Sequence, residues 1–465
     1  MLDLVNFNRV MLRELRVWRD SENRKPLVMR GARQVGKTTV IREFGNQYDQ
    51  YIELNLELFE NKILFEKETT FQDFVENIFF IKNKSFLKKE KTLIFIDEIQ
   101  EVPKAMNLLR YFFELEPNIS VIASGSMLET LFDGQMSFPV GRVEYLVLRP
   151  VTFIEFLYAL KESSAIEVLE KKPVPAFAHD QFLSLFRTFT LIGGMPEIVA
   201  NYAKNRDLKS LSKIYNSLIS SYSDDVEKYA KSKVQTEYIR SIIKNMFGNA
   251  GTRIKFEGFG NSNYKSKDMA EGLRTLEKAL VLNLIYPTTS TKLPLLPDNK
   301  KSPKLQVLDS GMLNYFVGLQ AEILGTNDLE SVYHGTLIEH FVGQEMLALQ
   351  FNSLSNLNFW IREKKGSSAE IDYIVNHQSK LIPIEVKSGK IGKLKSLLMY
   401  MDDAPHNQAV RVYAGKLVIE KQKTPNGKEF YLLNLPYYLS YDMLGYLEWF
   451  DEQIVLPNLS NGGAF

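Results

Sequence analysis

Three groups of residues in this chain have types and spacing suited to phosphate chemistry. The first group is a loop of glycines and one lysine, which follows an apolar run at 27–30 and precedes a run with helical spacing that ends at Phe44. The backbone N–H groups of such a loop surround phosphate oxygens, and the N-terminus of the next helix adds the positive end of its dipole. The sequence therefore predicts a nucleotide site here.

The positions of this loop have distinct expected roles. Lys37 is expected to contact the β- and γ-phosphates, and the Thr38 hydroxyl is expected to bind Mg²⁺. We predict that ATP binds through Gly31, Ala32, Arg33, Gln34, Val35, Gly36, Lys37, Thr38 and Thr39. A chance glycine turn is the alternative, but the order of strand, loop and helix favours the nucleotide site.

The second group stands at the end of a continuous apolar run at 92–96, which is typical of a strand buried on both faces. Asp97 and Glu98 follow it directly. In phosphate-loop ATPases the first acid at such a strand end holds Mg²⁺, and the next orients the attacking water. Asp97 is therefore the candidate metal ligand and Glu98 the candidate general base. The alternative is an acidic strand end that faces solvent.

Two further residues are placed near the nucleotide by this pattern. Ser124 ends another apolar run, so it either contacts the γ-phosphate region or caps the next helix. Arg142 precedes a strand-like run at 143–148 and could stabilise transition-state charge, in cis or on a neighbouring subunit. A surface ion pair is the other interpretation of Arg142.

The third group lies in the carboxyl-terminal third. Alternation puts Glu370 and Asp372 on one face of a predicted strand, and Glu385 and Lys387 on one face of the next. Acids from adjacent strands with a lysine can bind a hard divalent cation and orient water against a phosphodiester. A cross-strand ion pair is the alternative.

The elements that position these groups alternate between strand and helix, which indicates a parallel three-layer α/β sheet. We expect strands at 51–56, 92–96, 120–126 and 143–148 and helices at 71–81 and 105–115. The strand ends that carry Gly31, Asp97 and Ser124 should meet at one edge, where ligands bind in such sheets.

The middle of the chain has the order of a winged helix-turn-helix: helices at 208–230 and 234–247, an apolar helical stripe within 264–284, then a hairpin returning at 304–308. The cations expected at the recognition helix and wing are Lys265, Lys267, Arg274, Lys300 and Lys301. Residues 201–320 hold 19 Lys and Arg against 11 Asp and Glu, whereas the whole chain has a net charge of +1. A basic middle suggests DNA contact, although a protein-contact module or an ATPase lid would have the same order.

Composition limits the class of protein. The 465 residues suggest about three domains, and 45% hydrophobic with 24% charged residues indicates a globular chain. The absence of cysteine excludes disulfides and thiolate metal sites. No signal-peptide pattern and no apolar run near the ~20 residues of a membrane span is present, so we expect a cytoplasmic protein without a membrane partner.

The order of motifs resembles bacterial and archaeal AAA-type ATP-binding proteins that carry a carboxyl-terminal restriction-endonuclease-like domain of unknown function. The resemblance covers essentially the whole chain. It rests on the phosphate loop, 96–98, 123–126, 141–142, 150–156, Gly193–Pro196, 307–313, 335–339, 370–372 and 385–387.

The resemblance implies an ATPase domain at 1–205, a winged-helix domain at 206–325 and a PD-(D/E)XK nuclease-like domain at 326–465. It also implies that Glu339, Asp372 and Glu385 bind a second divalent cation, with Lys387 at the catalytic lysine position. The combined interpretation is an ATPase that couples nucleotide state to nucleic-acid binding or cleavage. The alternative is a non-catalytic ATP switch that assembles with a protein partner or with further copies of itself.

Overall fold

A parallel sheet carries the phosphate-binding loop. The computed structural model describes residues 5–67, 69–125, 141–226, 230, 232–319, 335–352, 356–362, 369–389 and 394–455. Within these residues a five-stranded sheet has the order β2-β3-β4-β1-β5. Its strands are β1 (Leu27–Arg30), β2 (Gln50–Asn55), β3 (Thr92–Asp97), β4 (Ser120–Gly125) and β5 (Glu144–Val147). All neighbouring pairs are parallel, which confirms the predicted parallel α/β sheet.

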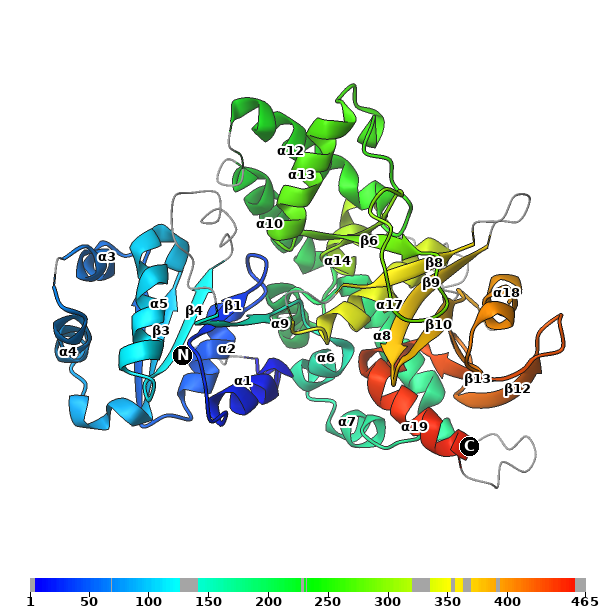
Figure 1. Cartoon of the computed structure of the whole chain (residues 1–465), viewed down its shortest axis with the longest axis horizontal. Coiled ribbons are helices and arrows are strands. Elements are labelled where there is room, and N and C mark those ends of the chain that lie inside the picture. The colour runs from blue at the N-terminus through cyan, green and yellow to red at the C-terminus, as the bar shows by residue number, and fades with distance from the viewer. Residues whose placement is uncertain are drawn as a thin grey trace.

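Helices cover both faces of this sheet, on the left of Figure 1. They are α1 (Met11–Arg19), α2 (Lys37–Gly45), α3 (Phe59–Glu66), α4 (Phe71–Ile81), η1 (Phe86–Lys91), η2 (Ile99–Glu101) and α5 (Pro103–Leu115). Alternation along β1 explains the layers. Leu27 and Met29 belong to the core cluster that includes α1 and α2, whereas Val28 belongs to the cluster that includes α3, α4 and α5.

A helical region follows the sheet. Its elements are α6 (Phe153–Leu160), α7 (Ser163–Leu169), η4 (Ala176–Ala178), α8 (His179–Ile192), α9 (Pro196–Asn205), η5 (Lys209–Leu211), α10 (Ser212–Asp224), α12 (Lys233–Met246), η6 (Phe247–Asn249), η7 (Phe259–Asn261), α13 (Ser266–Lys278) and α14 (Ser310–Phe316). The stripe expected within 264–284 is divided, because Leu280, at φ 60°, separates α13 from the next strand. None of the helices in the described ranges is both long and apolar enough to cross a membrane.

Two motifs of the sequence meet in this region. The backbone N–H of Gly194, between α8 and α9, donates to Asp309 at 2.6 Å. Gly193 has φ 75°, and a Cβ atom there would lie 2.3 Å from the Asp309 carboxylate. Only glycine fits such a position. The Gly193–Pro196 and Asp309 motifs therefore fasten α8 and α9 to α14.

The carboxyl-terminal part contains a second, mixed sheet. Among the described residues it has the order β12-β13-β11-β10-β9-β8-β6-β7. The strands are β6 (Leu282–Thr288), β7 (Lys304–Val307), β8 (Asn358–Ile361), β9 (Glu370–His377), β10 (Lys380–Val386), β11 (Gln408–Tyr413), β12 (Val418–Lys423) and β13 (Glu429–Pro436). The accompanying helices are α17 (Gly335–Ala348), α18 (Lys395–Asp403), η8 (Tyr437–Asp442) and α19 (Met443–Val455). Figure 1 shows this sheet on the right.

The predicted hairpin forms, but it is not a free-standing wing. β6 pairs antiparallel with β7 and parallel with β8, so one sheet crosses the boundary expected at residue 325. The loop between β6 and β7 also contacts the carboxyl-terminal part: Trp360 donates to the Thr289 carbonyl at 3.1 Å, and Thr291 donates to the Asp403 carbonyl at 3.1 Å. Lys300 and Lys301, which were expected on the wing, belong to this loop, and the loop is attached to the carboxyl-terminal part.

Candidate active site

The phosphate-binding loop adopts the conformation that its glycines permit. Gly36, with φ 94°, lies in the left-handed region immediately before α2. The Lys37 side chain is buried, and its Nζ donates to the carbonyls of Gly31 and Ala32 at 2.9 and 3.0 Å. Burial lowers the pKa of Lys37 to about 8, although Glu98 and Asp97 oppose this effect. The lysine is thus held where incoming phosphates would replace the carbonyls as its partners.

Three of the predicted residues are bonded to one another at the sheet edge. The Thr38 hydroxyl donates to Asp97 Oδ2 at 2.7 Å, and the Ser124 hydroxyl donates to Asp97 Oδ1. Asp97 and Ser124 are buried at adjacent strand ends of β3 and β4. Hydroxyl and carboxylate oxygens are ligands that suit Mg²⁺, so Thr38 and Asp97 fit the ion that the phosphate loop implies. Ser124 orients the acid.

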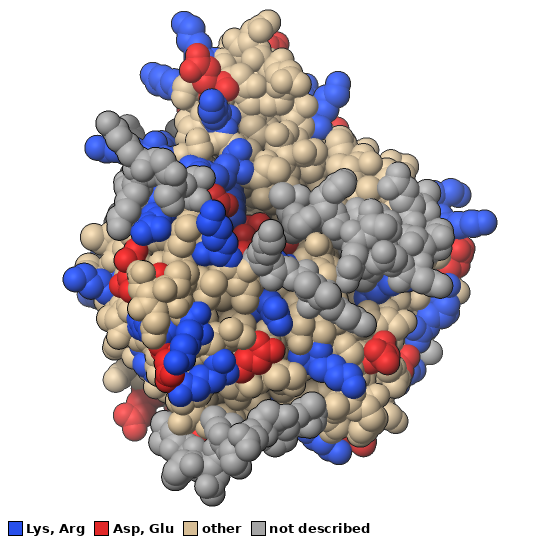
Figure 2. All heavy atoms as spheres, turned by 90° about the vertical axis from the view of Figure 1, so that its right-hand side faces the viewer, with Lys and Arg blue, Asp and Glu red and all other residues tan. Residues whose placement is uncertain are grey.

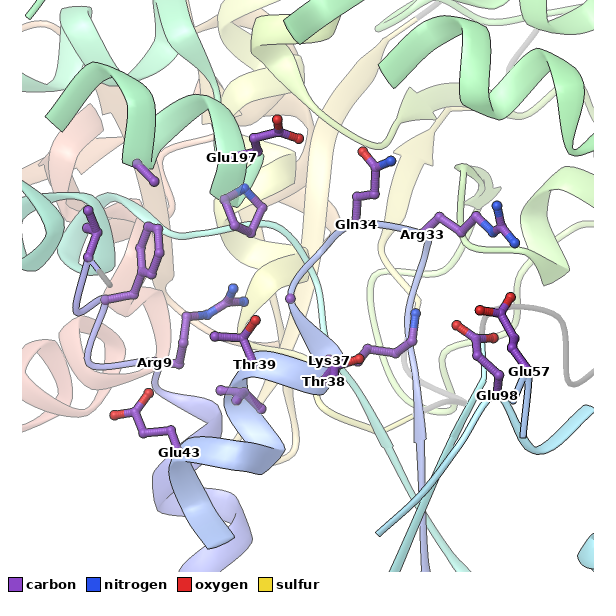
Figure 3. A pocket seen from close by; sticks show the side chains of 16 residues that line it. Arg9, Arg33, Gln34, Lys37, Thr38, Thr39, Glu43, Glu57, Glu98 and Glu197 are labelled. Carbon is purple, nitrogen blue, oxygen red and sulfur yellow. The ribbon is translucent and has the colours of Figure 1, made fainter. Parts of the chain in front are cut away.

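Glu98 stands beside this group in a constrained conformation. Its φ of 51° is left-handed, which is uncommon for a residue other than glycine and occurs often at functional sites. Its carboxylate accepts a hydrogen bond from Gln100 Nε2 at 2.5 Å. Burial raises the pKa of Glu98, and the negative charges of Asp97 and Glu57 add to this effect. Figure 3 shows the Glu57 and Glu98 side chains next to each other, on the side of the loop toward which Lys37 extends.

A cavity of about 570 Å³ opens on the loop. It is lined by Val5, Phe7, Arg9, Arg33, Gln34, Gly36, Lys37, Thr38, Thr39, Val40, Glu43, Glu57, Glu98, Pro196, Glu197 and Ala200. The loop residues and Glu98 were predicted from the sequence, whereas the lining residues that lie outside the motifs were not. Figure 3 shows one end of the cavity bounded by the charged loop residues and the other by Glu197 and the segment that carries Arg9.

Arg33 of the loop is tied to the helical region. Its guanidinium forms an ion pair with Asp225 at 2.8 Å, and its carbonyl accepts a hydrogen bond from the Tyr222 hydroxyl at 2.6 Å. Tyr222 belongs to α10, and Asp225 directly follows that helix. The loop sequence gave no sign of this contact, because the partners lie 189 and more positions away and belong to no motif.

Arg142 does not reach the nucleotide site of its own chain. In the parallel register Glu144 pairs with Leu27 at the start of β1, whereas Gly31 follows the other end of that strand. Arg142 thus lies at the opposite edge of the sheet, where it forms a 3.0 Å ion pair with Glu114. The expectation that Arg142 stabilises transition-state charge at the nucleotide site of its own chain is therefore wrong. The side chain is 43% exposed and remains accessible to another subunit.

The carboxyl-terminal candidates do converge. β9 and β10 are antiparallel neighbours, which is the condition that a site shared by the two strands needs. Lys387 Nζ lies 2.5 Å from Glu385, and Asp372 Oδ2 accepts a hydrogen bond from the Val386 N–H at 2.7 Å. Burial raises the pKa of Glu385 to about 7, with Asp372 adding to the shift and Lys387 opposing it. Glu339 approaches from α17.

A residue that the sequence analysis missed lies among these acids. Lys304 Nζ, from β7, is 2.6 Å from Glu339 and 3.6 Å from Asp372. In the described part of the chain, no three Asp, Glu or His side chains are grouped so that they could hold a metal ion. The ammonium of Lys304 thus lies between Glu339 and Asp372, two of the three acids of the expected cation site. β7 reads Lys-Leu-Gln-Val and is buried along its whole length, so the alternation of its residues gave no sign that Lys304 is buried.

Comparison with known proteins identifies the amino-terminal part. Residues 23–157 match the family model of an AAA domain. Residues 183–323 match a domain of unknown function (DUF8612), and residues 334–438 match another (DUF4143). Together with the loop geometry, the first match shows an AAA-like domain of the phosphate-loop class and supports ATP binding.

Individual proteins are similar over much of the chain. An uncharacterized protein of Haemophilus influenzae is 24% identical over 375 residues, which are 77% of this chain and 81% of that protein. A Walker-type ATPase of Pyrococcus abyssi has a TM-score of 0.44 at 17% identity and covers 66% of this chain and 94% of its own. The Orc1 protein of Aeropyrum pernix, in complex with DNA, has a TM-score of 0.28 at 13% identity and covers 68% and 93%.

Proposed function

We propose that this protein binds ATP with Mg²⁺ in the cavity beside the phosphate loop, hydrolyses it, and passes the nucleotide state to a nucleic-acid-binding middle region. ATP binding and hydrolysis are supported by one observation. Thr38 and Ser124 donate hydrogen bonds to Asp97, and this group lies beside Lys37 and Glu98. This arrangement supplies the phosphate-binding lysine, the metal ligands and the base that phosphoryl transfer to water uses.

Each side chain has a definite part in this proposal. Lys37 exchanges its two loop carbonyls for phosphate oxygens, while the loop N–H groups hold the remaining oxygens. Thr38 and Asp97 would hold Mg²⁺, which neutralises phosphate charge when bound. Glu98 orients the attacking water and accepts its proton. A base with a raised pKa is well matched to that task near neutral pH.

The contacts of Arg33 support the coupling of the nucleotide site to the middle region. Tyr222 donates a hydrogen bond to the Arg33 carbonyl, and Asp225 forms an ion pair with the Arg33 guanidinium. Any adjustment of the loop on nucleotide binding therefore acts directly on these two residues. A second contact joins the same parts, since Arg30 at the end of β1 donates to the Lys278 carbonyl of α13 at 3.2 Å. Two elements of the middle region, α10 and α13, thus rest on the phosphate-binding edge.

The middle region supports a nucleic-acid role through its order and surface. Arg253, which lies between α12 and α13 in the sequence, forms an antiparallel bridge with Lys304 of β7. The β6–β7 hairpin follows α13, and this is the order of a winged helix. α13 and the residue before it expose Lys265, Lys267 and Arg274. In Figure 2, Lys and Arg side chains lie on the upper part of the visible face, with some acids among them, and are also spread over the rest of that face.

ATP turnover measured with and without duplex and single-stranded DNA tests both parts. We expect wild-type turnover to rise with DNA and to disappear in Lys37→Ala. Replacing Lys267 and Arg274 by Glu should remove the DNA effect while leaving basal turnover intact. Lys84→Glu, on an exposed residue of the ATPase domain, is the matched charge control. If the protein hydrolyses ATP but DNA does not change the rate, the ATPase assignment stands and the nucleic-acid role is refuted.

A further inference from the structure

Lys304 is a buried cation in the place where the nuclease resemblance implies a metal ion. Its side chain is 5% exposed, and Nζ lies 2.6 Å from Glu339 Oε1, 2.7 Å from Glu370 Oε1 and 3.6 Å from Asp372 Oδ1. Three carboxylates from two elements, α17 and β9, therefore share one ammonium. The Phe359 ring lies 4.8 Å from Nζ and adds a cation–π contact.

Other groups of the cluster also have partners within the protein. Asp372 uses its other oxygen to accept the Val386 N–H at 2.7 Å, and Glu385 pairs with Lys387 at 2.5 Å. Arg253 approaches Glu370 at 3.6 Å. A divalent cation needs several oxygens that converge on it at 2.0–2.6 Å. Oxygens of Glu339, Glu370 and Asp372 converge on Lys304 instead, whereas Glu385 Oε2 is buried without a hydrogen-bond partner in the described structure.

Lys304 cannot easily leave this position. Its backbone lies in β7, which pairs with β6, and its neighbours Leu305 and Val307 are buried. Removing one member of a buried charged cluster is strongly unfavourable, because the opposite charges remain without compensation. The residues present therefore do not fit a divalent ion at this place.

We infer that Lys304 is the resident cation of the nuclease-like cluster, and that the carboxyl-terminal domain binds no divalent metal there and does not use one to cleave nucleic acid. The cluster instead anchors the β6–β7 hairpin to β9 and α17. The acids expected to serve a metal thus fix the middle region to the carboxyl-terminal sheet. This inference stands on the geometry of the cluster and is independent of the ATPase assignment.

Calorimetric titration of Mn²⁺ into the full chain without nucleotide tests it. Asp97→Asn serves as the background for every sample, so that the acid of the ATPase site does not contribute. We expect no saturable binding that depends on Asp372 in this background. Adding Lys304→Ala should create a Mn²⁺ site, and adding Asp372→Asn to that variant should remove it. Lys300→Ala, an exposed lysine of the same hairpin, should create none.

Thermal unfolding supplies the second readout. Mn²⁺ should raise the Tm of the Lys304→Ala variant by several degrees and leave the Tm of the Lys300→Ala variant unchanged. If Lys304→Ala does not fold, Lys304→Met with Glu339→Gln keeps the volume and removes one excess charge while leaving Glu370, Asp372 and Glu385. Mn²⁺ binding to the chain with Lys304 intact, abolished by Asp372→Asn, would overturn the inference. So would a folded Lys304 variant that gains no Mn²⁺ site.

Discussion

The guanidinium of Arg33 lies 2.8 Å from the carboxylate of Asp225, which joins the phosphate-binding loop to the end of α10. Asp225 is buried, so this ion pair differs from the exposed pairs that contribute little to stability. The Tyr222 hydroxyl reinforces the contact by donating to the Arg33 carbonyl. The loop that holds the phosphates is therefore also an interface between two parts of the molecule.

Asp225→Asn should weaken the communication between ATP and α10 without abolishing ATP binding. In wild type we expect ATP to change the amide hydrogen exchange of residues 212–224, because the loop moves against their helix. In the variant, which lacks the charge, that change should be reduced. Asp224→Asn is the matched control, since Asp224 is the exposed neighbour. Equal ATP-dependent exchange in wild type and Asp225→Asn would contradict this role.

Lys37→Ala should reduce ATP affinity by about 100-fold or more, because the variant loses the cation that faces the phosphates. Isothermal titration with ATP and Mg²⁺ measures the loss, and circular dichroism verifies the fold. Arg42→Ala is the control, because Arg42 lies on the same helix, is 58% exposed and pairs with Glu53. An unchanged ATP affinity in Lys37→Ala would move the site elsewhere.

The lowered pKa of Lys37 leads us to predict that ATP affinity depends on pH. In the nucleotide-free protein, burial lowers the pKa of Lys37 to about 8. Phosphates favour the charged form, so above pH 8 a proton must be taken up when ATP binds. Affinity should therefore fall as pH rises from 8 to 9.5, by as much as about tenfold per pH unit. Titrations in buffers of different ionisation enthalpy would reveal that proton uptake.

Glu98→Gln should retain ATP binding and lower turnover by about 10²–10⁴-fold, because an amide cannot accept the proton of the attacking water. Steady-state hydrolysis and ATP titration separate the two quantities. Glu57→Gln is the informative companion. The charge of Glu57 helps to raise the pKa of Glu98, so its removal should shift the acidic limb of the rate profile to lower pH. Wild-type turnover in Glu98→Gln would assign the base to another residue.

Much of the amino-terminal site could be predicted because its chemistry is local in sequence. The phosphate loop, the run that becomes β3 and the acids that follow it lie on consecutive residues, and parallel strands bring their ends to one edge. Thr38 and Asp97 meet for that reason. β9 and β10 are likewise close in sequence, and they pair as antiparallel neighbours.

The missed features depend on contacts between distant segments. Lys304 lies among Glu339 and Asp372 because the β6–β7 hairpin joins the carboxyl-terminal sheet through β8, and no local pattern encodes that pairing. Arg142 was expected near the phosphates from its order in the chain. The register of β5 instead places it at the far edge of the sheet.

Arg142 remains a candidate to act on a neighbouring subunit, and we predict that it does so in trans. Arg142→Ala should then lower turnover more than ATP binding. The decisive measurement mixes Arg142→Ala with Lys37→Ala, because each variant loses turnover for a different reason. A mixed assembly contains sites with both an intact loop and an intact arginine, so turnover should recover. Mixtures that show no more turnover than the sum of their components would refute the assignment.

The burial of Glu345 leads us to predict that the stability of the folded protein depends on pH. It lies on α17 and is 1% exposed; one oxygen accepts the Phe153 N–H at 3.0 Å, and the other is buried without a partner in the described structure. Burial raises the pKa of Glu345 to about 8, and the charge of Glu155 adds to the shift. The folded state therefore retains a proton that the unfolded state releases above its ordinary pKa of 4.5.

This contribution to stability is complete below pH 4.5 and is lost as pH rises toward 8, at up to about 1.4 kcal/mol per pH unit. Glu345→Gln resembles the protonated acid at every pH. Its free energy of unfolding should exceed that of wild type increasingly between pH 6 and 8, in urea unfolding followed by circular dichroism. Glu448→Gln, on an exposed residue of α19, should keep the wild-type slope. If Glu345→Gln and wild type lose stability in parallel over this range, Glu345 is ionised in the folded protein.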